Sequence, residues 1–228
     1  MATHLDLEEQ EQLDQLKAFW KQYGNLLTWV LIALLGAYAA WNGWNYWQRD
    51  QAIKAGAMFD ELQSAASVGD ADRAARVFAD MRSRFPDTAF TQQGGLLAAK
   101  VQFEKGQFEP ALATLTWVAE NASETEYRTV ARLRLAGILL DEKRYDDALK
   151  QLDGTVNAEF RPLVADRRGD ILLAQGKKDE AIAAYRSAWA AMDTKVDYRR
   201  LIEAKLNALG IDPSTPAGGP AAVADAAK

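Results

Sequence analysis

The most constraining feature of this sequence is an uncharged run over residues 22–48. At a rise of about 1.5 Å per residue, a helix of this length reaches roughly 40 Å, more than the roughly 30 Å hydrocarbon core of a bilayer. Tryptophan and tyrosine gather at both ends of the run, where rings that are part apolar and part polar suit the membrane interface. We therefore predict a transmembrane helix over residues 25–47, anchored in the lipid bilayer by Trp29, Leu31, Leu34, Leu35, Trp41 and Trp44.

Two other interpretations of the uncharged run are a buried core helix and a cleaved signal peptide. A core helix rarely stays uncharged over this length or carries aromatic rings at both ends. Residues 37–39, Ala-Tyr-Ala, have the small-residue pattern of a cleavage site, but the preceding leader is long and acidic and the run continues through Trp41. We therefore expect a permanent anchor. Lysine and arginine are balanced on its two sides, so charge alone leaves its orientation open.

A short leader, residues 1–24, precedes the predicted span. Its apolar residues recur at three- and four-residue steps while its acidic residues take the other faces, the pattern of an amphipathic helix. The apolar stripe suits the lipid interface or a membrane partner, although an acidic helix is a poor match for anionic lipid. A solvated helical extension of the span is an equal alternative.

The composition excludes most classes of catalytic and metal site. The 228-residue chain has no cysteine and one histidine, His4, so a single chain builds no disulfide, thiolate ligand, Ser-His-Asp triad or multi-histidine metal site. Its net charge is −5, and no basic excess points to nucleic acid. We interpret adjacent carboxylates such as Asp146 and Asp147 as helix-start residues rather than a catalytic pair. We expect no enzyme activity, no cofactor and no metal.

An internal repeat decides the fold class. Four segments share a turn-forming residue followed by acidic residues and an alanine, and the four alanines are 37, 37 and 33 residues apart, a period typical of stacked helix pairs. Twelve positions before each alanine stands Leu62 or a small residue, so the two helices of a pair are expected to cross closely there. The predicted packing residues are Ala74, Ala99, Ala111, Ala136, Ala148, Gly169 and Ala181.

The predicted fold is all-α, with a single N-terminal transmembrane helix followed by an α-solenoid. The solenoid has about four helix pairs and a closing helix, within a domain of residues 48–210. The expected pairs cover residues 52–85, 91–119, 126–152 and 162–192, and the closing helix covers residues 198–209.

Two stretches fall outside this helical pattern. Residues 92–95, Gln-Gln-Gly-Gly, lack the lysine and the glycine spacing of a phosphate loop, and we expect a turn between units there. Residues 211–228 are rich in proline, alanine and glycine without apolar periodicity, so we expect a disordered tail.

The repeats resemble tetratricopeptide repeats. Residues 169–189, GDILLAQGKKDEAIAAYRSAW, closely follow that family's G-x-x-L…G-x-x-x-x-A-x-x-x-Y-x-x-A pattern, and Pro86 closes the first unit where the family often has proline. The first two repeats depart from the pattern, with Leu62 and Gln102 where smaller or aromatic residues are usual. The resemblance implies a curved solenoid whose first helices line the concave side.

In this register the concave side presents a mainly apolar groove for a helix or an extended peptide. Ordinary core packing is the alternative for each single residue. Repeats that grip a C-terminal carboxylate place lysine, arginine and asparagine where this chain has Leu96, Leu133 and Asp166, so that clamp is not reproduced. The predicted groove residues are Leu96, Lys100, Phe103, Leu133, Gly137, Leu140, Asp166 and Asp170.

The order of the parts resembles a whole protein family. The leader, the span, the exit segment GWNYWQ at residues 43–48 and the degenerate repeats are similar to the ancillary SecYEG translocon subunits of proteobacteria, the YfgM family. The resemblance covers residues 8–209 and implies a cytoplasmic N-terminus, one inner-membrane helix and a periplasmic repeat domain. It also implies association with the SecYEG translocon and a PpiD-like periplasmic chaperone, and contact with exported unfolded polypeptides.

The leading functional hypothesis is therefore a non-enzymatic adaptor at the translocon. Anchoring confines the repeat domain to the membrane surface and raises its effective concentration near a membrane partner. The alternatives are a repeat scaffold for another cell-envelope complex and, less favoured, a hydrolase or isomerase that uses carboxylates alone.

Overall fold

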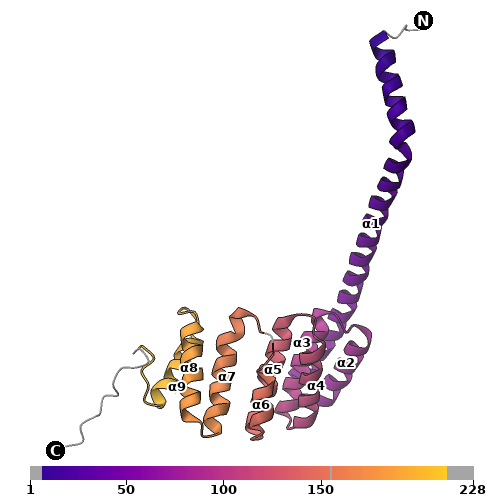
Figure 1. Cartoon of the computed structure of the whole chain (residues 1–228). Coiled ribbons are helices and arrows are strands. Elements are labelled where there is room, and N and C mark those ends of the chain that lie inside the picture. Colours follow the sequence, from indigo (N-terminus) through magenta and orange to yellow (C-terminus); the bar gives the residue numbers. More distant parts are fainter. Residues whose placement is uncertain (1–6, 155, 215–228) are drawn as a thin grey trace, which may run out of the picture. The chain divides into compact units, whose positions relative to one another are not determined.

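The computed structural model of the 228-residue chain describes residues 7–154 and 156–214, with side chains from residue 11 onward. These described residues form α-helices, one 3-10 turn and no strand, so the prediction of an all-α fold is confirmed. Figure 1 shows the elements. They are α1 Leu7–Ser67, α2 Ala71–Arg84, α3 Ala89–Glu104, α4 Phe108–Asn121, α5 Thr125–Asp141, α6 Tyr145–Gln151, η1 Ala158–Phe160, α7 Arg161–Ala174, α8 Lys178–Ala191 and α9 Tyr198–Ala208.

The chain divides into two compact units, Met1–Ile53 and Lys54–Lys228, and the division falls inside helix α1. Within the described residues, α1 is the one helix long and apolar enough to cross a membrane. The predicted anchor side chains, such as Trp29 at 64% and Trp41 at 67% relative exposure, are uncovered by protein. Apolar side chains with no protein cover along such a helix are what lipid contact requires.

Helix α1 continues the span in both directions, which for the leader is the alternative of a helical extension. It runs without interruption from Leu7 to Ser67, so the described part of the leader, the predicted span and the first repeat helix are one element. The leader's apolar stripe, including Leu16 and Trp20, is exposed. His4 and residues 215–228 of the predicted tail lie outside the described residues.

The second unit is built from the expected helix pairs. The end of α1 shares a buried cluster with α2 and is joined to it by the ion pair of Glu61 with Arg73 at 3.1 Å. Helix α3 packs on α4, α5 on α6 and α7 on α8, while α9 packs on α8. Figure 1 shows these helices running from α2 at the right to α8 and α9 at the left, with α3 and α4 overlapping in this view. Helix α6 is short, with seven residues, and η1 leads into α7 just before the expected start at Pro162.

The turn inside each pair repeats the same backbone geometry. The turn-forming residue has a positive φ in all four pairs, at Gly69, Gly106, Lys143 and Gly176. The next residue donates its backbone N–H to a carbonyl five residues back, for example from Gln107 to Gln102 at 2.8 Å. This is the Schellman ending, which satisfies a carbonyl of the last helical turn. The repeated sequence position therefore ends the first helix of each pair with a left-handed backbone. Lys143 adopts this conformation although, unlike glycine, it carries a side chain.

The small repeat positions are buried where the helices cross. The four repeat alanines, Ala74, Ala111, Ala148 and Ala181, each have 0% exposure. A Cβ atom built on Gly169 would lie 2.5 Å from Cε1 of Tyr185, so no larger residue fits at that crossing without movement.

The prediction of a turn at residues 92–95 is wrong. These residues lie inside α3, and Gln92, Gly94 and Gly95 are buried. A Cβ atom on Gly95 would lie 2.4 Å from Cγ2 of Val118 and 2.9 Å from Cε2 of Phe78. The glycines are present because neighbouring helices approach α3 closely there, which a glycine-based turn argument does not consider.

Candidate peptide-binding groove

An open groove of about 490 Å³ lies between α3, α5 and the start of α7, the first helices of the second, third and fourth pairs. Its volume is within the range of ligand pockets, roughly 300–1,000 Å³. We call it the binding groove. It is lined by Ala99, Lys100, Phe103, Leu115, Val130, Leu133, Arg134, Gly137, Ile138, Asp141, Phe160, Leu163 and Arg167.

The base of the binding groove is apolar. Leu115 and Ile138 belong to the main buried cluster of the domain, and Leu133 packs against the same cluster while remaining half-buried. The Phe103 ring is 36% exposed and meets the Phe108 ring edge-on, with 5.4 Å between centroids. Together with Phe160, these side chains leave apolar surface open beside a well-packed interior, which favours contact with a partner.

The rim carries three cations and one carboxylate. Arg134 Nη1 donates to the backbone carbonyl of Leu96 at 2.8 Å, which fixes its guanidinium beside α3. Burial lowers the pKa of Arg134, but from so high a value that the side chain remains charged at neutral pH. Lys100 is paired with Glu104 at 3.7 Å on the same helix, and the carboxylate in the lining is Asp141. The third cation is Arg167, which forms an ion pair with Asp170 on the same helix.

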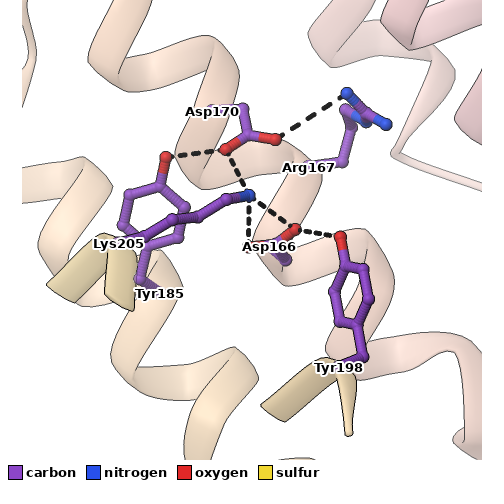
Figure 2. A network of polar contacts seen from close by, with 6 residues as sticks. All are labelled: Asp166, Arg167, Asp170, Tyr185, Tyr198 and Lys205. Atoms are coloured by element: carbon purple, nitrogen blue, oxygen red, sulfur yellow. Dashed lines mark hydrogen bonds and ion pairs between the residues drawn. The ribbon is translucent and has the colours of Figure 1, made fainter. Parts of the chain in front are cut away.

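A buried polar network adjoins the groove at the C-terminal end of the solenoid (Figure 2). Lys205 of α9 places its Nζ 2.8 and 2.9 Å from the two oxygens of Asp166 and 2.7 Å from Oδ1 of Asp170. The hydroxyl of Tyr198 donates to Asp166 and that of Tyr185 to Asp170, each at 2.8 Å. Asp166 is 2% exposed, so this network fastens α9 and α8 to α7.

The network also changes the acidity of its tyrosines. Burial first, and then the hydrogen bond to Asp170, raises the pKa of Tyr185 well above its usual value near 10. Burial and the hydrogen bond to Asp166 raise the pKa of Tyr198 in the same way. Both hydroxyls therefore stay protonated and keep donating to the carboxylates through the neutral range.

Arg167 joins the network to the groove. Its Nη1 is 3.7 Å from Oδ2 of Asp170, an ion pair rather than a hydrogen bond. The guanidinium lies across Gly137 of α5, where a Cβ atom would sit 3.8 Å from it. Because Oδ1 of Asp170 is held by Lys205 and Tyr185, the closing helix positions the partner of a groove cation.

The residues that the sequence predicted for the groove lie in three different places in the structure. Lys100, Phe103, Leu133 and Gly137 line the binding groove. Leu96 is buried in the main cluster, and Leu140 packs half-buried against it. Asp166 and Asp170 lie in the polar network, where internal partners hold both carboxylates, so they do not line the groove as predicted.

The groove residues that the sequence pattern did not indicate include Arg134, Phe160, Leu163 and Arg167. Three of them follow helical spacing around the start of α7, so shifting the α7 register three residues toward the N-terminus would have found Leu163 and Arg167. The helical spacing of these residues was visible in the sequence, but the register expected for α7 came from the repeat pattern.

The similarity to known proteins extends over both the apolar helix and the repeat domain. The sequence model of the tetratricopeptide repeat-like domain matches residues 17–211. A Neisseria gonorrhoeae protein named ancillary SecYEG translocon subunit is 31% identical over 212 residues, which are 92% of this chain and 100% of the relative. Proteins of the same name from Escherichia coli K12 and Haemophilus influenzae are 31% and 27% identical, over 89% and 80% of this chain and 97% and 89% of the relatives. No solved structure matches.

Proposed function

The chain belongs to the family of ancillary SecYEG translocon subunits, and on that premise we propose that it is a single-pass inner-membrane adaptor that associates with the SecYEG translocon. Its N-terminus is cytoplasmic and its repeat domain is periplasmic. The repeat domain recognises protein segments and catalyses no reaction. Within this proposal, the partner of the domain is a PpiD-like periplasmic chaperone, and exported unfolded polypeptides are further clients.

The observation that carries the proposal is the extent of the similarity. It covers the complete length of the Neisseria relative and 92% of this chain, so it includes the apolar helix as well as the repeats. A match confined to the repeats would support a protein-binding module alone, because such repeats serve many unrelated functions.

The structure adds physical support through helix α1. The first repeat helix is the C-terminal part of the same helix that contains the predicted span. A domain that begins on its own anchor stays at the membrane surface, where its effective concentration toward a membrane-embedded channel is high. Weak contacts then suffice for association.

The test is site-specific photocrosslinking in intact cells from Trp29, Trp44 and Phe103, with identification of the captured proteins. We expect channel subunits at the two tryptophan positions and a periplasmic chaperone or an exported chain at position 103. Phe90 is the matched control, since it also lies on α3 and is 37% exposed against 36% for Phe103, but does not line the groove.

Three outcomes would contradict the proposal in different ways. Cytoplasmic proteins captured at position 103 would reverse the orientation. Cell-wall or outer-membrane assembly proteins without channel subunits would indicate a scaffold for another envelope complex. Equal capture at positions 90 and 103 would remove the groove as the contact surface.

A further inference from the structure

We propose that the binding groove takes a protein segment in which an apolar side chain stands next to an aspartate or glutamate, with Arg167 and Arg134 binding the carboxylate. This inference rests on the proposed function, since it names the chemistry of the partner segment that the adaptor would recognise. It rests on the composition of the groove, the free donors of Arg167 and the position of the polar network.

The apolar requirement follows from the groove base. Eight of the lining side chains are aliphatic or aromatic, whereas the charged ones are exposed at Lys100, Arg134 and Asp141 and half-buried at Arg167. A side chain placed against Phe103, Leu133 and Phe160 removes apolar surface on both partners from water, which is favourable in proportion to the area buried. A wholly polar segment buries none of its own apolar surface against these side chains, so it gains no such stabilisation.

The acidic requirement follows from the charge of the rim. Three cations, Lys100, Arg134 and Arg167, face the groove together with one carboxylate, Asp141. A basic segment is repelled by this set, and a neutral one does not use it. Aspartate or glutamate is the complementary side chain, and a guanidinium binds its two oxygens through two parallel N–H donors.

Arg167 is the residue best prepared for that contact. Within the described ranges 7–154 and 156–214, its guanidinium makes no hydrogen bond, and its ion pair with Asp170 is long, at 3.7 Å. Asp170 does not depend on this pair, because Lys205 and Tyr185 bind its other oxygen at 2.7 and 2.8 Å (Figure 2). An incoming carboxylate can therefore engage Arg167 while Asp170 keeps its remaining partners.

The experiment selects a random twelve-residue peptide library displayed on phage against the full chain in nanodiscs. We expect enriched peptides to carry aspartate or glutamate within two positions of Leu, Ile, Phe or Met. Enriched peptides that are basic or lack an acidic residue would overturn the inference. Absence of enrichment, or self-association of the chain through this face, would also overturn it.

Matched variants identify the surface that binds the enriched peptide. Arg167→Gln removes a groove charge held by one long ion pair, and Arg132→Gln removes the same charge from α5 outside the groove. We expect Arg167→Gln to weaken binding of the labelled peptide about tenfold, measured by fluorescence anisotropy, and Arg132→Gln to leave it unchanged. Equal affinities for both variants would refute the role of Arg167.

A second pair of variants tests the apolar base. Phe103→Ala should weaken peptide binding, while Phe90→Ala, equally exposed on the same helix, should not. The outcome is separable from the proposed function. Channel subunits still captured at Trp29 and Trp44, together with peptides that ignore Arg167 and Phe103, would reject this inference and retain the adaptor.

Discussion

The main part of the repeat domain and its C-terminal end are stabilised by different kinds of contact. The main apolar cluster runs from Leu62 on α1 to Ile171 on α7 and is made of aliphatic, aromatic and alanine side chains. The second cluster, from Leu172 to Leu206, is smaller and lies against the network of Lys205 with its two carboxylates. The interior repeats therefore rely on shape, and the closing helix relies on shape together with charge.

The reason for the difference lies in the position of α9. Interior helices are packed on both sides by neighbours, and the buried polar side chains among them, such as Gln92, which donates to Ser123 at 2.6 Å, are uncharged. Helix α9 is the last helix of the described chain and buries Ile202 and Leu206 on one face. A buried polar network has a single well-satisfied geometry, so it selects one position for a helix that apolar contact would leave free to slide.

The largest expected effect comes from removing the network cation. Lys205→Met leaves the buried Asp166 carboxylate without its cation, and we expect unfolding free energy to fall by about 3 kcal/mol, because uncompensated buried charge is costly. Denaturant unfolding of the chain in detergent measures the change. Lys178→Met, at an exposed lysine of α8, is the control and should cost less than about 0.5 kcal/mol.

A double variant separates charge from packing in this prediction. Adding Asp166→Asn to Lys205→Met removes the buried charge and should restore part of the lost stability. If the double variant is no more stable than Lys205→Met alone, α9 is held by apolar contact like the other helices, and the contrast between the two ends fails.

The next effect tests the interior repeats, where shape decides. Gly95→Ala places a methyl group 2.4 Å from Val118 and 2.9 Å from Phe78, and we expect a loss of about 2 kcal/mol from overpacking. Gly137→Ala is the matched change, since its methyl group meets only the Arg167 guanidinium at 3.8 Å. It should be neutral or stabilise by up to about 1 kcal/mol through helix propensity. Similar thermal midpoints for the two variants would contradict close approach at Gly95.

The smallest expected effect is a loss of stability at alkaline pH, which tests the polar network at the C-terminal end. The raised pKa values of Tyr185 and Tyr198 keep both hydroxyls protonated in the folded chain, while the unfolded chain loses these protons near pH 10. The stability that these protonated hydroxyls contribute should therefore be fully present below pH 10 and be lost above it, by at most about 1.4 kcal/mol per pH unit for each tyrosine. Thermal midpoints between pH 9 and 11 measure this.

The control for the alkaline effect is the double variant Tyr185→Phe with Tyr198→Phe. It lacks both hydroxyls, so its stability should change less between pH 9 and 11 than that of the parent chain. An identical fall in both proteins would assign the alkaline loss to other groups.

Much of the architecture could be predicted from the sequence because its signals are local or periodic. The uncharged run predicts a span from its length and its aromatic ends, and the recurring alanines predict helix pairs from their period. The turn residues Gly69, Gly106, Lys143 and Gly176 occupy one repeat position and share one backbone geometry. In the groove, Lys100, Phe103 and Leu133 could be named because the repeat register places them on first helices, which the resemblance implies line one side of the solenoid.

The sequence by itself thus determined the all-α class, the anchor and the order of helix pairs, because neighbours in the chain decide helix formation and apolar period. Tertiary structure decided the rest. It placed Gly95 in a helix crossing rather than a turn and moved Asp166 from the groove to a pair with Lys205, 39 positions away. It also brought Arg134 and Arg167 to one rim. Such contacts depend on how distant helices pack, which no local pattern encodes.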